Sequence, residues 1–291
     1  MVFRSMYRFV KEIPVTGLRY PRIFGFEGAH YLVGSKAISQ VGDMTKYMPF
    51  IYVLGDDLLP VDQGRQINVN NIVSDVDRHE ISVWVRDITV SEDIVTMLIE
   101  FKENLAGAKF VHHNFIVWTS DLCRLSVSEE CRGKTFLFAM AETERGRVEL
   151  ESTIEPDLEM PDFIWGKYLF RLREPDGSTR PMSFDSVVDY STDKGHVLHG
   201  IRRCSPTEHR VLFSIRRHTD GEHHYDVCEA NTQDFVDYHD TEKSVFDRGS
   251  LDSDWFSYPS WFSHMRTNYL VCNTDDFGKA SNPVIFVEVT K

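Results

Sequence analysis

One phrase occurs twice in this chain, near its two ends, and this repeat is the feature that most constrains the fold. Residues 20–35 read YPRIFGFEGAHYLVGS, and residues 258–273 read YPSWFSHMRTNYLVCN. Aligned without a gap, the two share Tyr20/Tyr258, Pro21/Pro259, Phe24/Phe262, Tyr31/Tyr269, Leu32/Leu270 and Val33/Val271. Each copy has the pattern of a β-hairpin, with a strand opened by Pro, a short turn, and a second strand that starts near Tyr.

Weaker echoes of this hairpin lie between the two copies. They are VRDITVSEDIVTML (85–98), SEECRGKTFLFA (128–139), PDFIWGKYLFRL (161–172) and GIRRCSPTEHRVLFSI (200–215). A hairpin that recurs every few tens of residues is typical of a β-propeller, in which each blade is one four-stranded sheet. The copies lie 238 residues apart, so four intervals predict blades of about 60 residues and five predict about 48. We favour five blades. Six is the alternative, because the echoes and copies together number six.

The rest of the sequence also predicts an all-β chain. Short β-branched and aromatic runs recur between turn residues, and PDGS (175–178) and TDGE (219–222) are typical of hairpin turns. Residues 91–107 come nearest to a helical pattern, but their β-branched residues fit a strand equally well. We therefore predict one five-bladed propeller domain over 1–291, its ring closed by PVIFVEVTK (283–291) pairing with MYRFVKEI (6–13). A β-sandwich or jelly roll and a mixed α+β fold are the alternatives.

Composition narrows the partners. The chain carries 45 acidic and 32 basic residues for a formal charge of −13, which repels nucleic acid and favours a small-molecule or oligosaccharide partner. It has five cysteines, an odd number without a C-x-x-C pair, as expected of reduced, mostly buried thiols. No signal peptide and no membrane-spanning run is evident, so we expect a cytoplasmic protein without a membrane partner. The sequence carries no indication of oligomeric state.

Cofactor and metal motifs are missing from the sequence. No P-loop, G-x-G-x-x-G or G-x-S-x-G pattern occurs, and the acidic runs 247–254 and 273–278 lack the EF-hand spacing. His112 and His113 fit a strand, and the histidines at 218, 223 and 224 flank a turn without the spacing of a zinc site. Trp84, Trp118 and Trp261 lie within strand-like runs and are predicted to be core residues. We therefore expect no cofactor and no metal.

Several short motifs resemble those of the five-bladed β-propeller glycosidases, the clan that contains the arabinanase and xylosidase group and the invertase and levansucrase group. The resemblance rests on VWVRDI (83–88), SEEC (128–131), LDSDWFSYPSWF (251–262) and NYLVCNTDDFGKA (268–280). It implies a sugar bound in a funnel along the propeller axis. It also implies hydrolysis by two carboxyl groups that flank the glycosidic bond.

The resemblance also implies roles for particular residues. Asp87 would support the transition state, and Glu130, with Glu129 as the other choice, would be the general acid. The place of the first-blade Asp holds Tyr20 instead, so the sequence departs from the family at the expected nucleophile. The predicted sugar-binding residues lie at or near the starts of hairpins, and they are Tyr20, Arg22, Arg86, Asp162, Arg202, Asp254 and Tyr258.

Two other functions remain open at this point. A non-catalytic propeller that binds glycans or proteins would need aromatic and polar groups but no carboxylate pair. A biosynthetic sugar-transfer enzyme would use the same funnel while shielding it from water.

Overall fold

The computed structural model describes most of the chain. The described residues are 5–41, 44–70, 72, 81–91, 94–105, 109–119, 121–122, 125–131, 135–143, 146–154, 168–181, 194–205, 208–219, 222–235, 245–247, 256–274 and 282–290. Within these ranges the regular structure is entirely β, and no helix could cross a membrane. The prediction of an all-β chain is confirmed.

The strands of the described residues pair into five sheets. The first contains β2 (Leu18–Phe26), β3 (Ala29–Val41), β4 (Met44–Leu54) and β5 (Arg65–Gln66). The second contains β6 (Ile81–Ser91), β7 (Ile94–Leu105), β8 (Lys109–Thr119) and β9 (Ser126–Cys131). The third contains β10 (Thr135–Thr143), β11 (Gly146–Ile154), β12 (Tyr168–Arg173) and β13 (Thr179–Pro181).

The remaining two sheets come from the C-terminal third and the N-terminus. The fourth contains β14 (Lys194–Ser205), β15 (Glu208–Thr219) and β16 (Glu222–Thr232). The fifth has the order β17 (Phe246–Asp247), β1 (Ser5–Glu12), β20 (Pro283–Thr290), β19 (Thr267–Asn273) and β18 (Ser257–His264).

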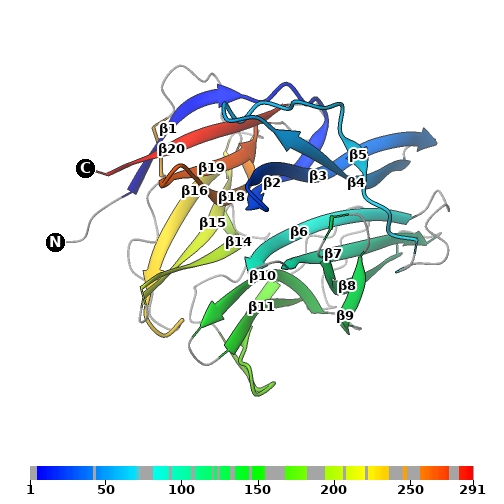
Figure 1. The fold of residues 1–291 in the computed structure, drawn as a ribbon. Helices are drawn as coiled ribbons and strands as arrows, with labels where there is room; N and C mark the ends of the chain where they lie inside the picture. Colours follow the sequence, from blue (N-terminus) through cyan, green and yellow to red (C-terminus); the bar gives the residue numbers. More distant parts are fainter. Residues whose placement is uncertain are drawn as a thin grey trace.

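The sheets are arranged as a β-propeller, as predicted (Figure 1). The first strands of successive sheets contact one another, in the order β2 with β6, β6 with β10, β10 with β14, β14 with β18, and β18 with β2. The middle of the molecule is therefore built from first strands. Residues on these strands share one region although they lie far apart in the sequence.

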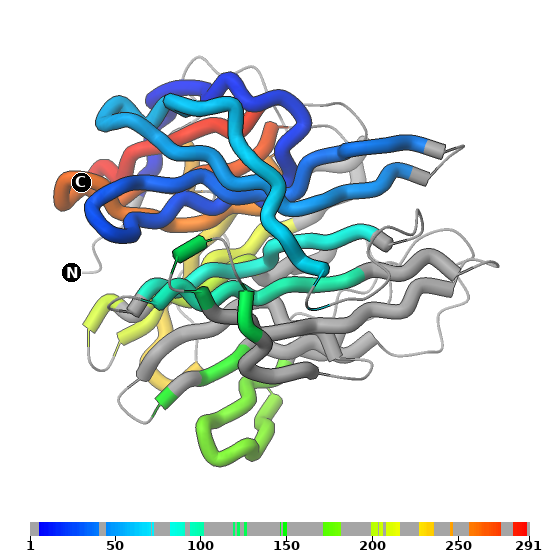
Figure 2. The backbone as a smooth tube through the Cα atoms, turned by 45° about the vertical axis from the view of Figure 1, so that its right-hand side comes forward, coloured from blue at the N-terminus to red at the C-terminus, as the bar shows by residue number. Residues whose placement is uncertain are grey.

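The first and last strands of the chain run side by side, as Figure 2 shows in dark blue and red. β1 and β20 pair antiparallel from Ser5↔Thr290 to Glu12↔Val284, with one register shift between Phe9 and Lys11. This is the pairing expected between 6–13 and 283–291.

The core explains why the hairpin phrase recurs. Side chains alternate between the two faces of a strand, so neighbours in sequence pack against different sheets. Leu32 packs in a cluster shared with the fifth sheet, whereas Val33 packs against Val85 and Met97 of the second. In the other copy, Leu270 packs against the fourth sheet and Val271 against the first. All four of these Leu and Val side chains are fully buried, so each copy presents Leu to the preceding sheet and Val to the next.

The hairpin turns match as well. Glu27 and Met265 occupy the same offset and have the same positive φ of 48°, and each is followed by a second positive-φ residue, Gly28 or Arg266. Two consecutive positive φ angles characterise the tight turn that suits the right-handed twist of paired strands. Next to these turns, Phe24 stacks on Tyr31 and Phe262 stacks on Tyr269, with centroid distances of 5.5 and 5.1 Å. The repeated Phe and Tyr are thus one cross-strand pair used twice.

Three smaller expectations have clear outcomes. Residues 94–105 form strand β7, which decides the ambiguous segment in favour of β-structure. PDGS lies in the connection between β12 and β13. TDGE joins the end of β15 to the start of β16, and its central residues 220–221 lie outside the described part. Cys228 and Cys272 are buried free thiols as expected, but Cys204 is exposed.

Candidate functional site

Each first strand carries a β-bulge at an equivalent place. The register shifts fall at residues 20–21 of β2, 86 of β6, 138 of β10, 199 of β14 and 258–259 of β18. A bulge leaves a residue out of the ladder and turns its side chain in a new direction. We use the term central site for five residues at or beside these bulges, namely Tyr20, Arg22, Arg86, His199 and Tyr258.

The two Tyr-Pro bulges have an unusual backbone. Tyr20 and Tyr258 both have φ of 55°, which is uncommon for a residue with a side chain. Opposite the first bulge, a Cβ on Gly34 would lie 2.6 Å from Cγ of Leu18 and 2.7 Å from the carbonyl oxygen of Arg19. Glycine is therefore required there by close approach of the partner strand. The Tyr side chains are aimed by strained backbone, a feature that clusters at functional sites.

Arg22 fastens three first strands together. Its Nε and Nη2 donate to the carbonyl oxygen of Arg86 at 3.0 and 2.6 Å, and its Nη1 donates to those of Pro21 and Tyr258 at 2.9 and 3.1 Å. The side chain is 4% exposed. Burial lowers the pKa of Arg22 to about 10, against the opposing effect of Asp87. Its described donors therefore bond backbone carbonyls of three first strands, and its predicted contact with a sugar stays a prediction.

Arg86 is held on two sides. Its Nε pairs with Glu100, whose side chain is 1% exposed, and its guanidinium lies 4.3 Å from the ring centroid of Tyr20. Burial lowers the pKa of Arg86, but the Glu100 carboxylate outweighs this effect and the pKa is raised overall. The guanidinium is charged at any physiological pH.

Half-buried aromatic rings form a row beside Arg86. Tyr258 stacks on Tyr20 with a centroid distance of 3.7 Å, Trp84 meets Tyr20 edge-on at 5.1 Å, and Tyr47 lies 4.3 Å from Trp84. Burial and the neighbouring Tyr20 raise the pKa of Tyr258 well above its ordinary value. We call these four residues the aromatic row. Trp84, expected in the core, is half-buried in this row.

His199 completes the central site from the fourth sheet. Its Nε2 lies 2.7 Å from Oγ of Ser214, and the side chain is buried. Burial, followed by the charges of Arg22 and Arg86, lowers the pKa of His199 well below its ordinary value. The histidine is therefore neutral at pH 7, mainly because it is buried, and the charges of Arg22 and Arg86 add to this effect.

The structure describes two carboxylates here, Asp87 and Glu100. Glu100 is committed to Arg86, whereas Asp87 is half-buried and its Oδ1 accepts a hydrogen bond of 3.0 Å from the N–H of Ile88. Glycoside hydrolysis needs two carboxyl groups on either side of the bond, so these two do not form such a pair. In the same described ranges, no group of three or more His, Cys, Asp or Glu side chains could hold a metal ion.

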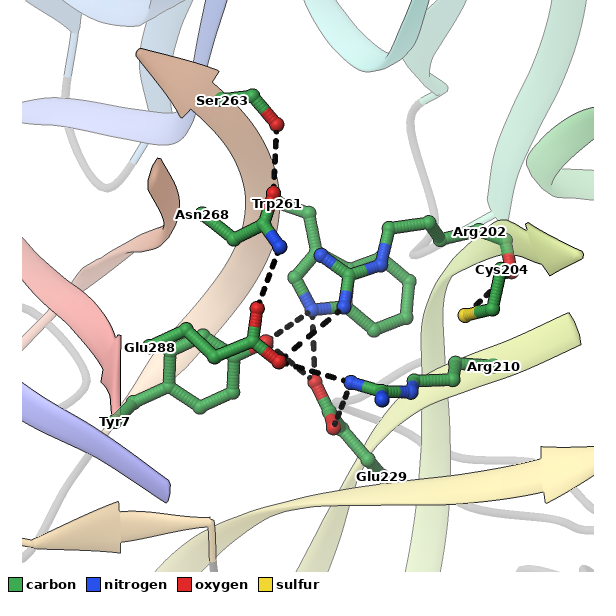
Figure 3. Close-up of polar contacts among 9 residues, drawn as sticks. All are labelled: Tyr7, Arg202, Cys204, Arg210, Glu229, Trp261, Ser263, Asn268 and Glu288. Carbon is green, nitrogen blue, oxygen red and sulfur yellow. Dashed lines mark hydrogen bonds and ion pairs between the residues drawn. The ribbon is translucent and has the colours of Figure 1, made fainter. Parts of the chain in front are cut away.

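A second polar cluster joins the fourth and fifth sheets (Figure 3). Glu229 accepts hydrogen bonds from the Tyr7 hydroxyl and the Trp261 indole, both at 2.8 Å, and its other oxygen lies 3.6 Å from Nη1 of Arg210. Burial raises the pKa of Glu229, although its three partners oppose this.

Glu288 is the other carboxylate of this cluster. It accepts from Nη1 of Arg210 at 3.0 Å and from Nδ2 of Asn268 at 2.7 Å, and Nη2 of Arg202 lies 3.7 Å away. The Arg202 guanidinium also lies 4.8 Å from the ring of Trp261. We call the cluster the interface network, and its members are Tyr7, Arg202, Arg210, Glu229, Trp261, Asn268 and Glu288.

The structure brings some of the predicted site residues together and separates others. Tyr20, Arg22, Arg86 and Tyr258 meet at the central site with Asp87 beside them. Arg202 belongs to the interface network instead. Asp162 and Asp254 lie outside the described residues.

Glu130 does not fall where the sequence suggested. With Glu129 it lies on β9, which is the fourth strand of the second sheet and pairs with β8 at Phe115↔Glu130. Three strand spacings, roughly 14 Å, separate this backbone from β6, which carries Arg86 and Asp87. The segment was expected to open the third blade, but its hairpin partner precedes it in the chain. Its role as the general acid stays a prediction.

Sequence reasoning missed His199, Glu100 and Tyr47. Of these, His199 had a signal, because it lies 59 residues before Tyr258 and so matches the predicted blade interval. Glu100 and Tyr47 lie within strands, and only the pairing of those strands places them near Arg86 and Trp84.

Comparisons with known proteins identify relatives of the fold. No family model matches the sequence, and a search of curated proteins finds no match either. Among solved structures, an α-L-arabinofuranosidase from Lactobacillus brevis has a TM-score of 0.61 at 12% identity, covering 95% of this chain and 92% of that one.

Two further structures show the same likeness. The α-L-arabinanase of Cellvibrio cellulosa complexed with arabinohexaose has a TM-score of 0.58 at 12% identity, covering 95% and 92% of the two chains. The GH32 β-fructofuranosidase of Bombyx mori has a TM-score of 0.55 at 12% identity, covering 98% of this chain and 62% of that one. This chain therefore has the β-propeller fold of glycoside hydrolases.

Proposed function

We propose that this chain is a divergent member of the five-bladed glycosidase clan that binds a sugar at the central site. The observation that carries the proposal is the aromatic row, four half-buried rings beside a fixed Arg86. Binding sites for organic ligands combine aromatic walls with a few fixed polar groups. The likeness to an arabinanase complexed with arabinohexaose supports a saccharide as the ligand.

The proposal includes the blade count and the closure of the ring. Five sheets whose first strands contact one another in turn, with β1 paired to β20 in the fifth, support five blades closed by the terminal strands. Hydrogen exchange tests this part. Amides of β1 should exchange only with global unfolding, like those of β3, and fast exchange confined to β1 would indicate an open ring.

Binding tests the sugar proposal directly. The purified chain would be screened against neutral and acidic oligosaccharides on an array, with hits measured by calorimetry. Replacing Tyr20 or Tyr258 with Ala should weaken binding at least about tenfold. Tyr31→Ala is the matched control, because Tyr31 is also a half-buried Tyr of the first sheet but stacks on Phe24 beside the hairpin turn. If no sugar binds, the proposal fails.

Hydrolysis is the second candidate, favoured by the fold shared with arabinanases and by Asp87 beside Arg86. Turnover of aryl glycosides that is abolished by Asp87→Asn would support it. Sugar binding without turnover would instead support a binding protein, or a transferase that lacks its second substrate.

We further propose a cytoplasmic location. Cys204, Cys228 and Cys272 are free thiols, which suits a reducing compartment. Cell fractionation would test this directly.

A further inference from the structure

Arg86 is held in one place by contacts on three sides. The buried Glu100 carboxylate pairs with its Nε, and Arg22 clasps its backbone carbonyl with two donors. Tyr258 and Arg86 both lie within 4.3 Å of the Tyr20 centroid, and two groups so close must occupy opposite faces of the ring. The Arg86 guanidinium and the Tyr258 ring therefore lie on opposite faces of the Tyr20 ring, and Glu100 and Arg22 hold Arg86 in this place.

Within the described part of the chain, the outer end of this guanidinium has no hydrogen-bond partner. Among the contacts of the described residues, none engages Nη1 or Nη2 of Arg86, and the side chain is 21% exposed. With Nε occupied, Nη1 and Nη2 still present two parallel N–H groups. This fork matches the two oxygens of a carboxylate.

The charge around Arg86 also favours an anion. Three guanidinium groups, those of Arg19, Arg22 and Arg86, lie near the aromatic row, where the structure describes two carboxylates, Asp87 and Glu100. Burial is the main cause of the depressed pKa of His199, and the charges of Arg22 and Arg86 depress it further. A local positive site within an acidic protein selects ligands by the field close to it.

We propose that the sugar bound at the central site is acidic, a hexuronic acid whose carboxylate accepts hydrogen bonds from Nη1 and Nη2 of Arg86. This inference rests on the proposed function and names its substrate class. The sugar ring would lie along the exposed part of the aromatic row, and Glu100 would keep the fork aimed at the carboxylate.

The test compares ligands that differ only in the acidic group. Methyl glucuronide and methyl galacturonide would be titrated against methyl glucoside and methyl galactoside by calorimetry and saturation-transfer NMR. Charged hydrogen bonds to a fixed fork predict that the uronides bind about 10- to 150-fold more tightly. Added salt should weaken binding of the uronides more than that of the neutral glycosides.

The double variant Arg86→Gln/Glu100→Gln removes both charges and leaves no unpaired carboxylate behind. It should lose the preference for uronides, so that uronides bind it no more tightly than the matching neutral glycosides do. The matched control is Arg180→Gln/Glu174→Gln, since Arg180 and Glu174 also pair through Nε, at 2.7 Å, in the third sheet. If the double variant does not fold, Arg86→Lys keeps a charge for Glu100 without the fork and should reduce the preference about tenfold.

The outcomes distinguish failure of the acidic-sugar inference from failure of the proposed sugar-binding function. Neutral glycosides that bind as tightly as the uronides, or more tightly, would overturn the acidic class and leave sugar binding intact. A uronide preference that survives in the double variant would also overturn the role of Arg86. If none of the four glycosides and no oligosaccharide on the array binds, the proposed function itself fails.

Discussion

The central site and the interface network use the same chemistry with different results. Each places an Arg guanidinium over an aromatic ring and beside a largely buried carboxylate, with Arg86 over Tyr20 and Arg202 over Trp261. In the interface network, both oxygens of Glu288 and both of Glu229 meet donors from neighbouring strands. At the central site, no contact among the residues that the structure describes engages Nη1 or Nη2 of Arg86.

The difference separates polar groups that stabilise a fold from those that can bind a ligand. A saturated network orders two sheets against each other, and removing one of its carboxylates leaves buried donors with fewer partners. A donor without a protein partner contributes little to the free energy of folding. On a fixed side chain, it can form a hydrogen bond with a ligand at little cost in conformational entropy. Four predictions probe this contrast, from the largest expected effect to the smallest.

The largest effect should come from Glu229→Ala. It leaves the Tyr7 hydroxyl without its acceptor and Arg210 with Glu288 as its one remaining carboxylate in the network, so we expect the free energy of unfolding to fall by about 3 kcal/mol, measured by urea denaturation. Sugar binding by the folded fraction should be unchanged. Glu174→Ala, at the more exposed pair with Arg180, is the control and should change stability by less than about 1 kcal/mol.

The two regions should respond to pH in opposite directions. The folded-state pKa of His199 is depressed, so only the unfolded chain binds its proton. Below about pH 6.5, stability should therefore fall by up to about 1.4 kcal/mol per pH unit. The folded-state pKa of Glu229 is raised, so this residue favours folding as the pH falls toward its ordinary value.

Single Gln variants separate the two contributions. His199→Gln should flatten the loss of stability below pH 6.5, and Glu229→Gln should steepen it. Denaturation midpoints from pH 4.5 to 7.5 would show this, and profiles that shift in the same direction would contradict the assignment.

The backbone of Tyr20 should make glycine preferable to alanine. At a φ of 55°, Tyr20→Gly should be more stable than Tyr20→Ala by about 1–2 kcal/mol. At Tyr31, which lies in the regular pairing of β3, the order should reverse. Thermal melts of the four variants would decide, and an alanine advantage at both positions would refute the left-handed bulge.

The smallest effect should come from Tyr7→Phe. The Trp261 indole keeps its bond to Glu229 when the hydroxyl is lost, so we expect a loss of about 1 kcal/mol. A loss as large as that of Glu229→Ala would show that the hydroxyl holds the network together.

The sequence predicted local features well. The shared Leu-Val pair and the Tyr-Pro bulge are visible in the sequence because each copy solves the same packing problem between neighbouring sheets. The terminal pairing was predicted because both segments are apolar strands at the two ends of a repeat.

Features that depend on strand order were not predictable. Glu130 looked like the start of a blade, and only its pairing with Phe115 shows that it ends the previous sheet. Arg202 was assigned to the sugar site, yet its partner Glu288 lies on a different sheet and far away in the sequence. Whether a side chain on a first strand faces the centre or a neighbouring sheet depends on a one-residue bulge, which composition does not show.

The close approach of β2 at Gly34 limits which strands the two hairpins could exchange. Position 272 is equivalent to 34, and there a cysteine fits. Any Cβ at 34 would collide with Leu18 and with the backbone at Arg19. The second strands of the two hairpins, β3 and β19, are therefore not interchangeable. A chimera that places β19 beside the native β2 would bring Cys272 into that contact, so β19 cannot replace β3 without a change in β2.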